Sequence, residues 1–191
     1  VKAGRAATKD VGATHVPLKS RGHPTREASQ AMAQVLREFF RRQKKKVVPA
    51  IDRATDTKAD DTGEMPSWWD SERWDKELSE DRAELCETQA TSAAKKALTD
   101  LELDPSAFDE PRIKSYIQAM AAGKATAVNN VTLRQLKAAL DNDVEDDAQG
   151  STPDGVVYKP EDSRADSTGL SFSTSVASWG AMDAYRQLAP A

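Results

Sequence analysis

Apolar side chains recur every three or four residues along most of the chain, which is the spacing of one face of an α-helix. The first such stretch spans residues 24–53, where Leu36 and Phe39 share a face. Pro24 suits a first helical position. Pro49 should end or kink the helix, because proline has no backbone N–H to donate. The pattern therefore predicts a helix over 24–53.

A second periodic stretch predicts a helix over 67–101 that is polar on most of its surface. Its acidic face carries Glu77, Glu80, Glu84 and Glu87. Because the first helix is basic, we expect the two to form an antiparallel hairpin held partly by paired charges.

Three shorter helices are predicted after this hairpin. The first spans 109–122 and stops at Gly123, the second spans 130–140, and the third spans 170–188. The last has one apolar side made of Phe172, Val176, Trp179 and Met182. The predicted fold is mainly α: a long helical hairpin plus smaller helices over 24–191, preceded by a disordered or extended basic tail over 1–23.

Charge is distributed unevenly between the two ends of the chain. Residues 1–53 contain 13 Lys and Arg against four Asp and Glu, a net charge of +9, whereas residues 54–191 have a net charge of −13. Such asymmetry suggests contact with nucleic acid or another polyanion at the basic end. The candidate nucleic-acid or partner contacts are Lys2, Arg5, Lys9, Lys19, Arg21, Arg37, Arg41, Arg42, Lys44, Lys45 and Lys46. Pairing of the basic helix with the acidic helix is the alternative explanation of the same charges.

Candidate catalytic and metal-binding groups are few. The two histidines lie in the predicted tail, and Ser92-x-x-Lys95 lacks the companion motifs of penicillin-binding enzymes. The acidic run 141–147 lacks the glycine and glutamate of a helix–loop–helix calcium site. We therefore predict no catalytic, cofactor-binding or metal-binding residue, and a protein that is not an enzyme. Cys86 is the single cysteine, so no internal disulfide forms, and no apolar run reaches the roughly 20 residues of a membrane span.

Three tryptophans cluster near the start of the second predicted helix. Trp68, Trp69 and Trp74 are candidates for a protein interface, because tryptophan is enriched at binding hot spots. Packing within the core explains the cluster equally simply and is the interpretation we favour.

Four segments together resemble a known family, the tailed-phage minor head or head-morphogenesis proteins, and the similar C-terminal region of some phage portal proteins. The segments are Gln-Ala-Met-Ala-Gln-Val-Leu-Arg-Glu-Phe-Phe-Arg-Arg-Gln at 30–43, Asn-x-Val-Thr-x-x-Gln-Leu-x-x-Ala-Leu at 129–140, Ser-Arg-Ala at 163–165 and Ser-Trp-Gly-Ala-Met-x-Ala at 178–184. The resemblance covers roughly residues 25–188. Members often carry an Ile-Ala-Arg-Thr-Glu-like sequence at the start of the last helix, where this chain has Leu-Ser-Phe-Ser-Thr at 170–174.

The resemblance implies a virion structural protein, a portal-associated minor head component that aids capsid assembly, genome packaging or ejection. Its expected partners are the portal and capsid proteins or copies of itself in a ring, with non-specific DNA as a further candidate. It would be assembled in the host cytoplasm and reside in the virion. A start at Val1 would suit a portal protein whose core precedes this segment. The alternative function is a small helical nucleic-acid-binding protein that holds phosphate backbone with its basic tail and first helix.

Overall fold

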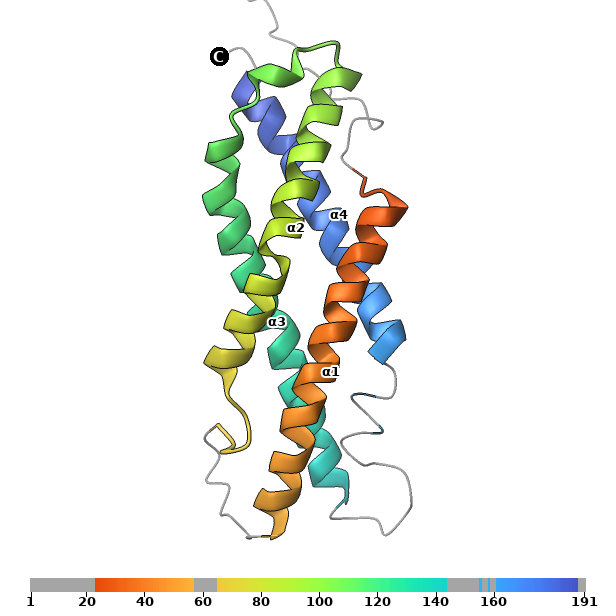
Figure 1. The fold of residues 1–191 in the computed structure, drawn as a ribbon, viewed down its shortest axis with the longest axis vertical. Helices are drawn as coiled ribbons and strands as arrows, with labels where there is room; N and C mark the ends of the chain where they lie inside the picture. Colours follow the sequence, from red (N-terminus) through yellow and green to blue (C-terminus); the bar gives the residue numbers. More distant parts are fainter. Residues whose placement is uncertain (1–22, 57–64, 144–154, 156–157, 159–160, 189–191) are drawn as a thin grey trace, which may run out of the picture.

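The computed structural model describes residues 23–56, 65–143, 155, 158 and 161–188. Within these residues it contains four α-helices and one 3-10 turn, namely α1 (Arg26–Asp56), α2 (Ser71–Asp100), η2 (Pro105–Ala107), α3 (Glu110–Asp143) and α4 (Glu161–Leu188). The helices run alternately down and up along an elongated bundle (Figure 1). The prediction of a mainly α fold is confirmed, whereas the predicted tail lies almost entirely outside the described residues.

The fourth helix, more than the first hairpin, organises the bundle. α1 and α2 are antiparallel as predicted, but each packs more extensively against α4 than against the other. α2 also packs along α3, while α3 and α4 touch little. The core therefore centres on α2 and α4, with buried side chains such as Leu36, Leu78, Ile117 and Val176 contributed by all four helices.

Side chains just ahead of α1 and α2 set where these helices begin. The hydroxyl Oγ1 of Thr25 accepts a hydrogen bond from the backbone N–H of Ala28 at 3.1 Å. Asp70 Oδ1 accepts one from Arg73 N–H at 3.0 Å. Both satisfy backbone donors that a first helical turn leaves free. The helices accordingly begin at 26 and 71, later than the predicted starts at 24 and 67.

α1 does not end at Pro49 but continues to Asp56. The apolar face persists on both sides of the proline, since Val47 and Ile51 are both buried in the core. Pro49 itself is exposed. Water can therefore reach the backbone carbonyl that the missing N–H leaves without a helical partner. The helix therefore tolerates Pro49, and it ends three residues after the predicted boundary at 53.

α3 is one helix where the sequence predicted two, over 109–122 and 130–140. Gly123 lies inside it on the solvent side, and a methyl group placed there would meet no atom within 4 Å. Ala121 and Ala125 are both buried against the bundle. Packing of these neighbours outweighs the preference of glycine for a helix end, which amounts to about 1 kcal/mol.

α4 begins at residue 161, nine residues before the predicted start, and two glycines let it approach its neighbours closely. A Cβ at Gly180 would lie 2.2 Å from the backbone oxygen of Ala90 in α2. A Cβ at Gly169 would lie 2.8 Å from the backbone nitrogen of Ala33 in α1. The absence of side chains at these positions therefore lets α4 pack backbone to backbone against two helices.

The described helices also answer the question of a membrane span. None of them combines the length and the apolar character needed to cross a bilayer.

Candidate functional sites: charged and aromatic side chains

Arg37, a candidate nucleic-acid contact, is bound to α4. Its Nε lies 3.1 Å from Asp162 Oδ1, and its Nη2 pairs with Asp166. The arginine is half-buried, while both aspartates are more exposed. Arg37 therefore joins the first helix to the last instead of presenting a free charge to an outside partner.

Arg42 supplies the predicted pairing between the basic and acidic helices. Its guanidinium pairs with Asp81 of α2 and lies 4.0 Å from Glu77 Oε2. Another predicted member of that acidic face, Glu87, turns instead to Lys114 of α3 at 3.3 Å. The hairpin is thus held partly by charges, as expected, but acidic residues of α2 form ion pairs with both α1 and α3.

The remaining basic candidates have different environments. Arg41, Lys45 and Lys46 are exposed on α1, and Lys44 is half-buried. The candidates in the predicted tail, namely Lys2, Arg5, Lys9, Lys19 and Arg21, lie outside the described residues. Among the described candidates, Arg37 and Arg42 are held by carboxylates of the same chain, while Arg41, Lys45 and Lys46 lie close together on the exposed side of α1.

The tryptophan cluster belongs mainly to the core. Trp69 and Trp74 are 5% and 3% exposed, and Trp68 is partly buried against them. Trp74 meets Phe39 of α1 edge to face, with ring centroids 6.0 Å apart. Burial of Trp69 and Trp74 within their own chain corrects their candidacy for an exposed protein interface and confirms the packing interpretation.

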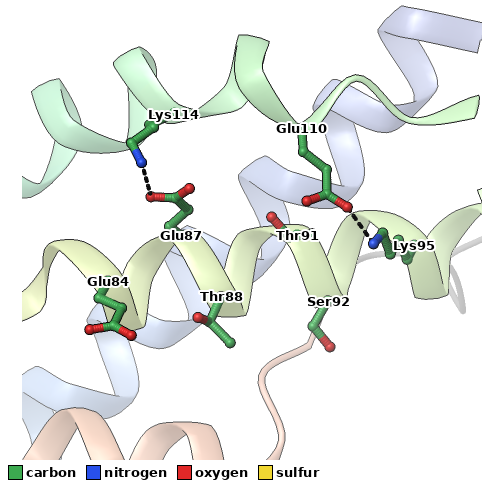
Figure 2. A pocket seen from close by; sticks show the side chains of 8 residues that line it. All are labelled: Glu84, Glu87, Thr88, Thr91, Ser92, Lys95, Glu110 and Lys114. Atoms are coloured by element: carbon green, nitrogen blue, oxygen red, sulfur yellow. Dashed lines mark ion pairs between the residues drawn. The ribbon is translucent and has the colours of Figure 1, made fainter. Parts of the chain in front are cut away.

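A groove of about 670 Å³ lies between α2 and α3 (Figure 2). It is lined by Glu84, Glu87, Thr88, Thr91, Ser92, Lys95, Glu110 and Lys114. Lys95 pairs with Glu110, and Lys114 pairs with Glu87, so both lysines are engaged by carboxylates across the groove. The side chain of Ser92 points away from the Lys95–Glu110 pair (Figure 2). The Ser92-x-x-Lys95 spacing therefore does not create a serine–lysine hydrogen bond.

Arg82 is a buried charge that sequence reasoning missed. Its side chain is 0% exposed, and its Nε and Nη2 each donate a 3.1 Å hydrogen bond, to the backbone oxygens of Leu78 and Ala121. The guanidinium carbon lies 4.4 Å from the centroid of the Phe172 ring. Burial lowers the pKa of Arg82 to about 10, so the group remains charged at neutral pH. Arg82 follows Leu78 by four residues and therefore falls within the apolar stripe of this helix. This position was the feature of the sequence that could have predicted its burial.

Arg164 occupies a similar setting at the start of α4. Its Nη2 donates to Thr132 Oγ1 at 2.5 Å and to the backbone oxygen of Val128 at 3.4 Å. Its guanidinium carbon lies 4.5 Å from the Phe40 ring centroid. Burial lowers the pKa of this arginine too. Within the part of the chain that the structure describes, neither Arg82 nor Arg164 forms an ion pair with a carboxylate.

One of the few contacts between α3 and α4 is a pair of aromatic rings, Tyr116 of α3 and Trp179 of α4. The rings of Tyr116 and Trp179 stack with centroids 3.9 Å apart and an interplanar angle of 9°. Tyr116 is 46% exposed and Met182 is 44% exposed. We call Tyr116, Trp179 and Met182 the aromatic surface. The sequence predicted one apolar side made of Phe172, Val176, Trp179 and Met182. Phe172 and Val176 are core residues, Trp179 is partly buried against the core, and Met182 is exposed.

Metal-binding side chains do not gather in the described ranges. No three His, Cys, Asp or Glu residues come together there as a metal ion would require.

Comparison with known proteins gives no family assignment. No protein-family model, curated protein or solved structure matches the chain.

Proposed function

We propose that this chain is a virion structural protein of a tailed phage, a portal-associated minor head component without catalytic activity. It would aid capsid assembly, genome packaging or ejection through contacts with the portal, with capsid proteins or with copies of itself in a ring. The resemblance over residues 25–188 supports the proposal. Its segments at 30–43, 129–140 and 178–184 fall in α1, α3 and α4, and all contribute to one core.

The observation that carries an assembly role is the aromatic surface. Tyr116 stacks on Trp179 and yet remains nearly half-exposed, and an aromatic ring of this kind offers a large apolar contact area with few rotatable bonds, which is typical of residues that anchor protein interfaces. Contact with another subunit would bury the exposed parts of Tyr116 and Met182. Such burial would stabilise the complex by roughly 25 cal/mol for each Å² of apolar surface removed from water.

The sequence 170–174 fits a structural role for the last helix. In the family that the chain resembles, the third position of this segment is often arginine, whereas here it is Phe172. The ring of Phe172 is buried and faces the guanidinium of Arg82. This chain therefore stabilises the helix through an aromatic–arginine contact with α2.

Direct binding of DNA by α1 is less well supported. Arg37 and Arg42 engage carboxylates of the same chain, so a phosphate would have to compete with them. Each phosphate contact requires a cation that is available to displace counterions. We therefore place assembly ahead of nucleic-acid binding for the helical part of the chain.

The test is the assembly state of the purified chain, alone and mixed with the portal and capsid proteins of its own phage. We expect discrete oligomers or a complex with the portal by light scattering after size-exclusion chromatography. The double variant Tyr116→Ser, Met182→Ser should release monomers while retaining the helical circular dichroism of the wild type.

Leu170→Ser is the matched control. Leu170 is also an exposed apolar residue of α4, but it precedes Trp179 by nine residues and so lies about half a turn away around the helix. This variant should assemble normally. A chain that stays monomeric and ignores portal and capsid proteins would refute the proposal.

A further inference from the structure

A second hollow, between α3 and α4, differs from the groove of Figure 2 in its charge. It has a volume of about 340 Å³ and is lined by Lys124, Ala127, Val128, Val131, Arg164, Ser167, Thr168, Ser171 and Phe172. We call it the α3–α4 pocket. Its lining contains two cations and three hydroxyl groups but no carboxylate.

The two cations of the pocket are not neutralised by other described side chains. Lys124 is half-buried and forms no ion pair with any side chain that the structure describes. Arg164 is anchored by its Nη2 on Val128 and Thr132, and its buried Nη1 has no hydrogen-bond partner. Asp162 and Asp166 of α4 both pair with Arg37 on α1. Among the side chains that the structure describes, none therefore offsets the positive charge of Lys124 and Arg164.

Two hydroxyl groups of the pocket are free to contact a ligand. Serine and threonine within a helix often donate to the carbonyl four residues earlier, as Thr174 and Ser175 of α4 do at 2.8 and 3.0 Å. Thr168 and Ser171 make no such bond. They line the pocket together with the two cations, and this is a combination of donors suited to the oxygens of an anion.

A third cation, Arg82, contacts one of the residues that line the pocket. Phe172 lines the pocket, and the buried guanidinium of Arg82 lies 4.4 Å from the centroid of its ring. Arg82 also donates to the backbone oxygen of Ala121, one turn before Lys124 on α3. In a medium of low dielectric constant the field of such a charge acts over a longer range than it would in water.

From these features we propose that the α3–α4 pocket binds a small ligand carrying a phosphate-type oxyanion, with Lys124, Arg164, Thr168 and Ser171 as the contacts. The volume falls at the lower end of the range for small-molecule sites, roughly 300–1,000 Å³. Val128, Val131 and Phe172 provide an apolar wall, so a phosphate monoester with a compact apolar group fits better than inorganic phosphate.

The experiment titrates the full-length chain with inorganic phosphate and with phenyl phosphate at constant ionic strength, using calorimetry or amide chemical shifts. We expect saturable binding, tighter for phenyl phosphate. Lys124→Gln should weaken it about tenfold or more, since a charge-assisted hydrogen bond contributes at least that factor. Ser171→Ala, on an exposed position that should fold normally, should weaken it by a smaller factor.

Lys76→Gln is the matched control, because Lys76 is an exposed lysine of α2 outside the pocket. It should bind phosphate like the wild type. Binding that fails to saturate, or that responds equally to Lys76→Gln and Lys124→Gln, would overturn the proposal.

A random DNA duplex added as competitor distinguishes two sources of the phosphate group. Displacement of phenyl phosphate by the duplex identifies a backbone phosphate, and its failure identifies a free organophosphate; either result upholds the pocket. None of these measurements depends on assembly, so the pocket and the proposed virion role can fail independently.

Discussion

At the scale of single residues, α2 buries two ionisable side chains one helical turn apart. Arg82 and Cys86 are both 0% exposed, and burial disfavours the charged form of each. It lowers the pKa of the arginine to about 10 and raises that of the thiol to about 11, the latter shift being reduced by the positive charge of Arg82. Arg82 therefore stays charged and Cys86 stays protonated at neutral pH.

Replacing Arg82 by an apolar side chain of similar length tests the cost of its buried charge. Arg82→Met should leave stability unchanged or raise it by about 1–3 kcal/mol, because it removes a desolvated cation while keeping most of the volume. Arg82→Ala should lower stability by roughly 2–4 kcal/mol through the cavity it leaves. Urea unfolding of both variants measures the difference. Equal destabilisation would mean that the hydrogen bonds to Leu78 and Ala121 matter more than the volume.

The raised pKa of Cys86 makes stability depend on alkaline pH. The unfolded thiol, with a pKa near 8.5, releases its proton before the folded one does, so the folded state loses stability as pH rises from there toward 11. The loss relative to Cys86→Ala should reach about 2 kcal/mol by pH ~10, at 1.36 kcal/mol per unit. Urea unfolding of both proteins at several pH values checks it. Parallel pH profiles would show that the thiol is not buried in solution.

At the scale of the helix, glycines at different positions have opposite consequences. Gly123 interrupts the helical pattern of the sequence but faces solvent within α3. Gly180 also lies within a helix, but its hydrogen faces the backbone oxygen of Ala90. Gly123 lowers the stability of its helix without improving any packing contact. Gly180, by contrast, is required by the close approach of α4 to α2.

Alanine at these two positions should change stability in opposite directions. Gly123→Ala should raise it by about 1 kcal/mol, because alanine is the better helix former and its methyl group meets nothing. Gly180→Ala should lower it by about 1–3 kcal/mol, because a Cβ 2.2 Å from Ala90 O forces the helices apart. Thermal unfolding of the pair is the measurement. A destabilised Gly123→Ala would indicate a helix boundary at this glycine.

At the scale of the whole molecule, opposite charges from distant segments meet across the bundle. Arg37 reaches α4 and Arg42 reaches α2, so part of the basic excess of the first 53 residues is compensated within the fold. The exposed members of the basic set on α1 are Arg41, Arg42, Lys45 and Lys46. Because carboxylates of the same chain engage Arg37 and Arg42, we expect any binding of duplex DNA to depend more on the N-terminal basic residues than on α1.

Charge reversal in the two basic segments tests this expectation. Wild type should bind a random duplex more weakly than about micromolar at ~150 mM salt, as is typical of non-specific contacts. Lys2, Arg5 and Lys9 changed to Glu should flatten the dependence of log affinity on log salt by up to about 0.9 per lost contact. The same charge reversal at Arg41, Lys45 and Lys46 should change this salt dependence little. A larger effect from the α1 set would favour the nucleic-acid function over assembly.

The sequence by itself determined the helical class, the apolar face of α1 and the concentration of positive charge near the N-terminus. These features are local: the spacing of Leu36 and Phe39 identifies a buried face without reference to the rest of the chain. The packing of Trp69 and Trp74 was predictable for the same reason, since large apolar side chains beside a periodic stripe are usually buried.

Only the tertiary structure decided where the helices end and which of them pack together. α1 continues past Pro49 and α3 past Gly123 because burial of Ile51 and Ala125 offsets local penalties of about 3 and 1 kcal/mol. Burial of Arg82, exposure of Met182, and the carboxylate-free lining of the α3–α4 pocket depend on how α4 lies against its neighbours. A periodic pattern shows which face of a helix is apolar, but the energy of contact between distant segments determines what covers that face.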